Sequence, residues 1–401
     1  MPKPIPPALS PEIQNAVIKL CRDLIAEPSY SGHEDRAAAV LRRFMETQGY
    51  DEIFMDDYGS LVGCIHGLRP GPTLVFDGHL DTVPAEAAAW RHPPFEARIE
   101  DGRIYGRGAS DMKGAIAAMA VGAAAYANAA RRDFPGTLCV AGTVHEECFE
   151  GIAARKISER LRPDFVVIGE ASELDLKIGQ RGRAEIVLET FGVEAHSANP
   201  GKGVNAVLAM LRLAQAIDAI APPQHPVLGP GQAVLTDIVS SPYPGASVVP
   251  SRCRATYDRR LHVGETPESV LAPFDTALQA CAAADPTFKG RAALARGRDT
   301  CHTGAVIEAE RFFPGWLFPE SAPFVQRALA ALREAGLDPK ISRYSFCTNG
   351  SHYAGEKGIP TLGFGPSCES QAHTVDEYIE LEELYQAVAG YTALCSLVSD
   401  R

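Results

Sequence analysis

The feature of this sequence that most constrains its fold is an alternation of short apolar runs with helical stretches. The runs at 73–76, 137–144 and 164–169 are predicted strands, and the stretches at 112–130 and 150–161 are predicted helices. Strands that alternate with helices build a largely parallel sheet that carries helices on its faces. Ligands of such sheets bind outside the carboxyl ends of the strands, so polar residues at those ends are the first candidates for a site.

The pattern changes near residue 184. The segment AEIVLETFG alternates charged and apolar residues, as a half-exposed antiparallel strand does. Predicted helices at 204–221 and 266–283 and predicted strands at 233–239 and 253–262 follow it. This order of elements predicts a small α+β domain of residues 184–316.

The first domain resumes near residue 317. Its remaining predicted elements are amphipathic helices at 11–27 and 35–49, a helix at 322–335, a strand at 359–364 and a helix at 380–398. A chain of 401 residues exceeds what one hydrophobic core usually supports. The predicted fold class is therefore α/β, with a mostly parallel sheet domain of residues 1–183 and 317–401 that is interrupted by the α+β domain.

Composition excludes several classes of partner. The net charge of −12 argues against nucleic acid and anionic membranes. The apolar run at 115–130 is rich in alanine and too short for a membrane span, so we expect a buried helix there. The N-terminus lacks the apolar core of a signal peptide. Ten scattered cysteines without a C-x-x-C pair indicate reduced thiols, which is typical of a cytoplasmic protein.

The segment FDGHLDTVPA follows the first buried run directly and raises the first functional question. Alternate residues of an extended strand share one face, so Asp77, His79 and Asp81 would project together. His79 and Asp81 would then form a metal ligand and its orienting partner. The alternative is a polar turn with a solvated histidine and two capping aspartates.

Four further motifs stand near the ends of predicted elements. They are GRGASDMKG with Asp111, VHEECFEG with Glu146 and Glu147, VVIGEASEL with Glu170, and QAHTVDEYI with His373. Each has a structural interpretation by itself, such as a helix cap or a solvated acidic pair. Together they supply two imidazoles and several carboxylates, a ligand set that suits two divalent ions, above all zinc, sharing a carboxylate. A remaining glutamate could shuttle the proton.

These motifs resemble a known family of co-catalytic zinc hydrolases. That family includes acetylornithine deacetylase, succinyl-diaminopimelate desuccinylase, aminoacylase and carboxypeptidase G. The similar blocks run in order along nearly the whole chain: GHLDTVP, GRGASDMKG, the Glu-Glu pair, the GE motif, AHSANPGKGVNA and AHTVDEY. The resemblance implies one zinc bound by His79 and Glu170, a second bound by Glu147 and His373, and Asp111 as the bridging ligand. Cobalt or manganese could substitute for zinc.

The resemblance also implies roles for residues that are not ligands. Asp81 would hold His79 in the correct tautomer, and Glu146 would be the general base and then the acid toward the leaving nitrogen. The inserted domain would be a lid that also dimerises, with His196 reaching the partner's site to stabilise the oxyanion. Arg260 would hold a substrate carboxylate. Asp77 stands outside the ligand set, and we interpret it as structural.

Two departures from the family pattern fall where substrates are recognised. Ser247 stands where asparagine is common, and Asn349 stands where many members have aspartate. Both are candidate substrate-binding residues, and they prevent a direct transfer of substrate specificity. The segment 297–316 is longer than expected and could add a loop that faces the substrate.

The predicted function is a di-zinc amidohydrolase or metallopeptidase. Its substrate would be an N-acyl amino acid, or a small peptide with a free carboxylate, and the enzyme would be a homodimer that binds neither nucleic acid nor membranes. Two alternatives share the same metals: a dipeptidase or aminopeptidase, and an amidohydrolase of N-carbamoyl (ureido) acids. A catalytically inactive scaffold is a third alternative, which the complete set of ligand residues disfavours.

Overall fold

The structure is a computed structural model that describes residues 9–399. Its contacts divide the chain into two compact units. Unit 1 comprises the described residues up to Gln180, Arg298–Glu308, and the chain from Leu317 onward, and unit 2 comprises Arg181–Gly297 and Ala309–Trp316. Each unit has its own sheet and its own hydrophobic core, and each is described by itself.

Unit 1 is built on a mixed sheet whose centre is parallel. The strand order is β1-β2-β6-β3-β7-β22-β8-β20, and β21 pairs with β8. The strands are β1 (Glu52–Met55), β2 (Leu61–His66), β3 (Arg69–His79), β6 (Pro135–Thr143), β7 (Phe165–Ile168), β8 (Leu176–Gln180), β20 (Trp316–Leu317), β21 (Ile341–Tyr344) and β22 (Thr361–Gly363). The four neighbouring strands β6, β3, β7 and β22 are parallel to one another. The pairs β1–β2, β2–β6 and β22–β8 are antiparallel.

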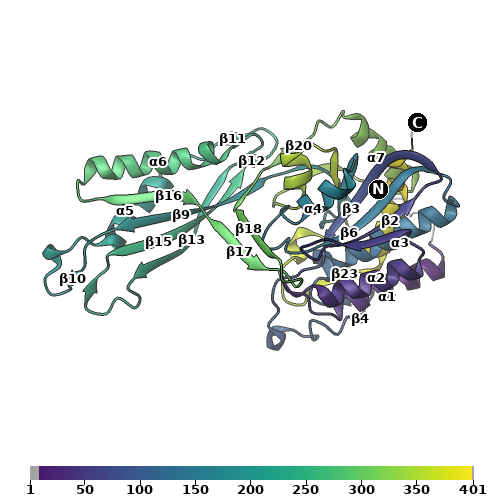
Figure 1. Ribbon diagram of the computed structural model, residues 1–401, viewed down its shortest axis with the longest axis horizontal. Helices are drawn as coiled ribbons and strands as arrows, with labels where there is room; N and C mark the ends of the chain where they lie inside the picture. The colour runs from purple at the N-terminus through teal and green to yellow at the C-terminus, as the bar shows by residue number, and fades with distance from the viewer. Residues whose placement is uncertain (1–8, 400–401) are drawn as a thin grey trace. The chain divides into compact units, whose positions relative to one another are not determined.

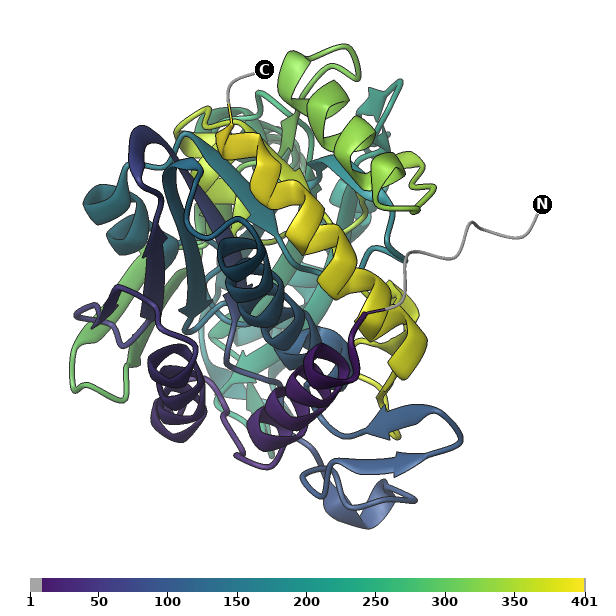
Figure 2. The same ribbon diagram turned by 90° about the vertical axis from the view of Figure 1, so that its right-hand side faces the viewer.

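Helices cover both faces of this sheet. The helices of unit 1 are α1 (Pro11–Ile25), α2 (Asp35–Thr47), α3 (Gly114–Ala129), α4 (Ala154–Leu161), α7 (Pro323–Glu334) and α8 (Leu381–Leu394). Figure 2 shows α1, in purple, and α8, in yellow, packed against α3. Helix α3 is buried over nearly its whole length, which confirms the buried helix expected there. Helix α4 packs on the opposite face, where Ala154 and Ile157 contact a second apolar cluster.

Two smaller sheets belong to this part of the chain. One contains β4 (Arg98–Glu100), β5 (Arg103–Tyr105) and β23 (Tyr378–Glu380), and the other is the hairpin of β17 (Arg296–Thr300) and β18 (Val306–Glu310). The sequence places this hairpin in the inserted domain, but residues 298–308 pack with unit 1. Two contacts hold the hairpin to unit 1: Thr303 donates a 2.7 Å hydrogen bond to the carbonyl of Asp57, and His302 contacts the carbonyl of Gly59.

Unit 2 is an antiparallel sheet with two helices on one face. Its principal strands are β9 (Gly182–Phe191), β13 (Gln232–Ser241), β15 (Arg252–Leu261) and β16 (Lys289–Leu294), and its short strands are β10 (Ala195–His196), β11 (Gln224–His225), β12 (Gly229–Pro230), β14 (Val248–Val249) and β19 (Phe312–Phe313). The order is β13-β15-β9-β16. Helices α5 (Ala206–Asp218) and α6 (Pro267–Ala284) pack on this sheet (Figure 1). Tyr257 and Phe274 are buried in the core of this unit.

The predicted fold class is confirmed. The predicted helix at 112–130 begins later, at Gly114, because Ala109–Lys113 form a separate irregular turn with non-helical dihedral angles at Asp111. Strands β1, β2 and β8 were not predicted. Among residues 9–399, no helix combines the length and the apolar character that crossing a bilayer requires.

Candidate functional site

Four of the predicted site residues lie where the strands of unit 1 end. His79 is the last residue of β3, and Glu146 and Glu147 follow the end of β6 at Thr143. Glu170 follows β7 by two residues. Because β3 pairs in parallel with both β6 and β7, these ends meet at one edge of the sheet.

Asp111 lies between the two predicted histidines. Its Oδ1 is 2.9 Å from Nε2 of His79, and its Oδ2 is 3.3 Å from Nε2 of His373. Each oxygen of one carboxylate therefore faces a different imidazole. Burial alone would raise the pKa of Asp111, but hydrogen bonds with His373 and His79 outweigh burial and hold this pKa well below its usual range.

Two further carboxylates complete these pairs. Oε1 of Glu170 is 3.5 Å from Nε2 of His79, and Oε2 of Glu147 is 3.0 Å from Nε2 of His373. Burial and the charge of Asp111 raise the pKa of Glu170 to about 8, and the same two causes raise the pKa of Glu147. The bonds to Asp111 and Glu147 raise the pKa of His373 to about 10.

Glu146 is the acid without a partner in this cluster. Its side chain is buried, and its Oε1 has no hydrogen-bond partner among the residues that the structure describes. Burial raises the pKa of Glu146 well above the usual value for a carboxyl group. A buried carboxyl group with a free oxygen and a raised pKa has the properties of a general base and acid.

The donor set fits divalent cations. Residues 9–399 contain two groups of three ligand atoms that lie within 4.8 Å of one another: His79 with Glu146 and Glu170, and His79 with Asp111 and Glu147. Imidazole nitrogens and carboxylate oxygens are ligands that zinc takes from proteins. The buried acids outnumber the histidines beside them, so bound cations would relieve the cost of burying them.

A family model, that of peptidase family M20/M25/M40, matches residues 75–396. The chain belongs to this family. The match includes every residue of the cluster, and the M20 chain is accordingly a metal-binding hydrolase that acts on amide or peptide bonds.

Relatives of the M20 chain match it over nearly its full length. It is 32% identical to the uncharacterized protein YgeY of Escherichia coli K12, over 96% of this chain and 94% of that protein. It is 30% identical to the succinyl-diaminopimelate desuccinylase of Methylobacterium radiotolerans, over 94% and 95%. The YXEP protein of Bacillus subtilis, described as a dinuclear metal-binding peptidase of the M20 family, shares the fold with a TM-score of 0.71, 15% identity and coverage of 96% and 98%.

Asp81 contacts the site differently from the expectation. The Nδ1 of His79 lies 2.8 Å from the backbone carbonyl of Asp81, whereas the carboxylate oxygen is 3.6 Å away. The carboxylate instead accepts the backbone N–H groups of Glu146 and Glu147, both at 3.1 Å, and the hydroxyl of Ser31 at 2.8 Å. The orienting group of His79 is therefore the carbonyl, because the side chain is engaged by the loop after β6.

Asn349 is buried and hydrogen-bonded within unit 1. It is 2% exposed, its amide nitrogen donates to Asp77 at 2.8 Å, and its oxygen accepts the N–H of Gly151 at 2.8 Å. Both ends of the Asn349 amide are therefore hydrogen-bonded to the protein, and its role in substrate binding stays a prediction. Asp77 also accepts hydroxyl groups of Thr143 and Tyr353, which agrees with its structural interpretation, although its partners are side chains.

Glu377 supports the site and was not predicted. Its buried carboxylate accepts the backbone N–H groups of Ser110 at 2.8 Å and Asp111 at 3.0 Å, and pairs with Arg107 at 2.6 Å. It thus fixes the irregular turn that carries Asp111. The only sequence signal was its position four residues after His373, within the same motif.

The remaining predicted residues belong to unit 2. His196 is exposed, and strand β10 places it opposite Val248 of β14, beside Ser247, whose carbonyl accepts the N–H of Ser197. Arg260 lies on β15 and pairs with Asp258 at 3.1 Å. The structure therefore brings His196 and Ser247 together.

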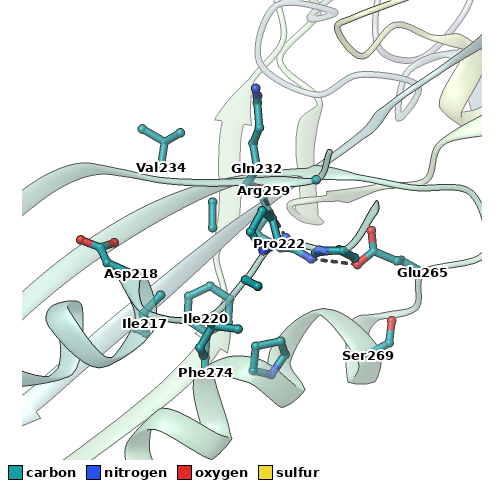
Figure 3. A pocket seen from close by; sticks show the side chains of 15 residues that line it. Ile217, Asp218, Ile220, Pro222, Gln232, Val234, Arg259, Glu265, Ser269 and Phe274 are labelled. Carbon is teal, nitrogen blue, oxygen red and sulfur yellow. Dashed lines mark hydrogen bonds and ion pairs between the residues drawn. The ribbon is translucent and has the colours of Figure 1, made fainter. Parts of the chain in front are cut away.

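Unit 2 also contains a cavity of about 700 Å³, shown in Figure 3. Ile217, Ile220 and Phe274 give it apolar walls, and Arg259 pairs with Glu265 at its polar side, at 2.8 Å. None of the predicted site residues lines it. The buried guanidinium of Arg259 is thus paired with an acid.

Proposed function

We propose that the chain is a two-metal amidohydrolase that cleaves N-acyl amino acids or small peptides with a free carboxylate. One observation carries the proposal: the two oxygens of Asp111 face the Nε2 atoms of His79 and His373. A carboxylate shared between two imidazoles is the arrangement that a bridging ligand requires. Glu170 and Glu147 would complete the two sites.

Zinc is the proposed metal, with cobalt or manganese as substitutes. Its ligands would be nitrogen and oxygen atoms only, which zinc accepts in catalytic sites. When bound, two such ions polarise a carbonyl and acidify water. The dinuclear metal binding described for the YXEP protein is consistent with this number of ions.

The proposed role of Glu146 follows from its environment. Its unpartnered Oε1 would take a proton from the attacking water, and the resulting carboxyl group would give a proton to the leaving nitrogen. The backbone N–H of Glu146, held by Asp81, fixes the direction of the side chain.

The substrate class rests on the relatives and on unit 2. Relatives named succinyl-diaminopimelate desuccinylase remove an acyl group from an amino acid. Arg260 supports recognition of a substrate carboxylate, because its side chain is 30% exposed and a guanidinium binds carboxylates in a fork geometry. Ser247 and His196 are proposed to contact the substrate and its developing oxyanion. A dipeptidase or aminopeptidase and an N-carbamoyl amidohydrolase remain the alternatives.

The proposed assembly is a homodimer through unit 2. Strand β13 is the first in its sheet and exposes Val234, Leu235, Ile238 and Val239 by 39–53%. A long apolar edge strand is a template for pairing with another chain. Free thiols at all ten cysteines support the proposal of a cytoplasmic enzyme.

A hydrolysis screen tests the proposed substrate class. N-acetyl, N-succinyl and N-carbamoyl amino acids, dipeptides with a free amine, and the same dipeptides N-acylated would be incubated with protein loaded with zinc or cobalt. Turnover of the N-acyl compounds with a free carboxylate, and its loss when that carboxylate is amidated, is the expected result. Turnover confined to free-amine dipeptides or to ureido acids would replace the proposal by the corresponding alternative.

A further inference from the structure

The carboxyl groups of Glu34 and Asp81 hold the backbone segment that carries Glu146 and Glu147. The N–H groups of His145, Glu146 and Glu147 point to oxygens of Glu34 or Asp81. Glu34 accepts the first at 3.2 Å, and Asp81 accepts the other two at 3.1 Å each. In a strand or helix, backbone carbonyls would accept these N–H groups. Here, carboxyl groups from two distant segments accept them instead.

This segment needs such support because its backbone turns sharply. His145 has a φ of 55°, in the left-handed region that side-chain-bearing residues rarely adopt. The strand β6 ends two residues earlier, at Thr143. The orientation of the Glu146 and Glu147 side chains is set where this turn ends, so a small rotation at His145 would move both.

The side chain of Glu34 accepts the N–H of His145 and does not cap its own helix, α2. It precedes α2 at the N-cap position, yet its side chain makes no capping hydrogen bond there. The residue is fully buried, and its Oε1 accepts the N–H of Gly32 at 2.9 Å as well as that of His145. A glutamate that leaves its helix N-terminus to reach a backbone group 111 residues away indicates a role at the far end of that contact.

We propose that Glu34 is a positioning residue that fixes the His145 backbone and thereby aims the carboxylates of Glu146 and Glu147. The proposal rests on the proposed function of that pair. Partners behind metal ligands typically contribute about 10–100-fold to metal affinity or activity. Loss of the Glu34 acceptor should therefore weaken the ion that Glu147 holds and leave the ion at Glu170 largely unchanged.

The chemistry of Glu34 supplies a conservative variant. Burial, together with the charge of Asp81, raises the pKa of Glu34 to about 8, so the group is largely protonated at neutral pH. The amide of glutamine has the same shape and keeps the oxygen that accepts the His145 N–H. Glu34→Gln should therefore behave like the wild type, and Glu34→Ala should not.

The experiment combines calorimetric zinc titration of chelator-stripped protein with steady-state kinetics. For Glu34→Ala we expect one of the two zinc equivalents to bind about 10–100-fold more weakly, and kcat to fall by a similar factor at an unchanged KM. Glu34→Gln should restore both within about threefold. Glu34→Asp moves the acceptor back by one methylene group, so its zinc affinity and kcat should lie between those of the alanine and glutamine variants. If the alanine variant does not fold, the aspartate variant takes its place in the comparison.

A matched control separates positioning from stability. Asp164 accepts the N–H of Thr73, which lies on β3 six residues before His79, at 2.8 Å and across 91 residues of the same unit. Asp164→Ala should lower the unfolding midpoint and leave both zinc affinities and kcat unchanged. The proposal is overturned if Glu34→Ala behaves like this control, or if Glu34→Gln is as impaired as Glu34→Ala. Wild-type protein that bound no zinc would instead contradict the proposed function.

Discussion

Two glutamates that are equally buried behave in opposite ways in the two units. Glu170, in unit 1, and Glu189, in unit 2, are each 5% exposed. Burial and the charge of Asp111 raise the pKa of Glu170 to about 8. Burial would also raise the pKa of Glu189, but hydrogen bonds from Arg252 and Arg291 outweigh it and lower that pKa.

The two carboxylates differ in their partners. Glu189 is enclosed by two arginines, as expected for an acid that stabilises a sheet. Glu170 faces His79 and lies among further acids, and among residues 9–399 it forms no ion pair with an arginine or a lysine. An acid that is paired with arginine is structural, whereas acids gathered around imidazoles indicate a site for cations.

The largest expected effect is a loss of catalysis that leaves the metal ligands intact. Glu146→Gln should lower kcat by about 10²–10⁴-fold, because an amide cannot accept the proton from water. Metal content should stay at two ions per chain, because Glu146 is not a ligand in this account. Elemental analysis and single-turnover kinetics check both points, and loss of metal from this variant would exchange the roles of Glu146 and Glu147.

The second effect asks whether unit 2 contributes to the chemistry of a partner chain. His196→Ala should lower kcat by about 10²–10³-fold with both metals retained, as expected for one lost oxyanion donor. Mixing this variant with Glu146→Gln after dissociation should restore activity in mixed dimers, because one of their two sites then has both groups intact. Mixed dimers that stay inactive would show that His196 does not act across the interface.

The third prediction tests the comparison of Glu170 with Glu189 directly. Glu170→Gln should weaken binding of one metal ion by more than tenfold, whereas Glu189→Gln should leave both metal affinities unchanged and lower stability by ~1 kcal/mol. Isothermal titration and urea denaturation of the two variants measure these quantities. Equal effects of the two substitutions on metal binding would remove the distinction between paired and unpaired acids.

The smallest effect concerns a paired acid in unit 1. Burial would raise the pKa of Glu356, but hydrogen bonds from His352 and Arg155 outweigh it and lower this pKa to about 2. Because the folded pKa lies below the unfolded value, Glu356 stabilises the fold above about pH 4.5, and this contribution is lost as the pH falls toward 2. Glu356→Gln should cost ~1 kcal/mol at pH 7 and progressively less below pH 4.5 in urea titrations. A difference independent of pH would contradict the assignment.

The sequence predicted what local patterns encode. The periodicity of apolar residues identified the central strands and the principal helices. The motifs led us to His79, Asp111 and Glu170, whose side chains lie close to one another in the structure. The central strands were predictable because their apolar runs are local patterns, and the residues that follow these strands meet because a parallel sheet brings the carboxyl ends of its strands together.

Supporting contacts escaped prediction because they join distant segments or use backbone groups. The carbonyl of Asp81, and not its side chain, is hydrogen-bonded to His79, and a carbonyl leaves no signature in the sequence. Glu34 and Glu377 meet backbone N–H groups 111 and 266 residues away. The contacts of Asn349 with Asp77 and Gly151 were not predicted, because an amide that binds substrate and an amide that braces a loop look alike in a motif.

Zinc titration of chelator-stripped wild-type protein beside Asp111→Ala tests the central claim most directly. The account predicts two bound equivalents in the wild type, inactivity of the stripped protein, and recovery of turnover as the second equivalent binds. Asp111→Ala should lose the tight binding of both ions, because its two oxygens face the ligands of both sites. A wild type that binds one equivalent or none, or stripped protein that keeps its full activity, would contradict the account.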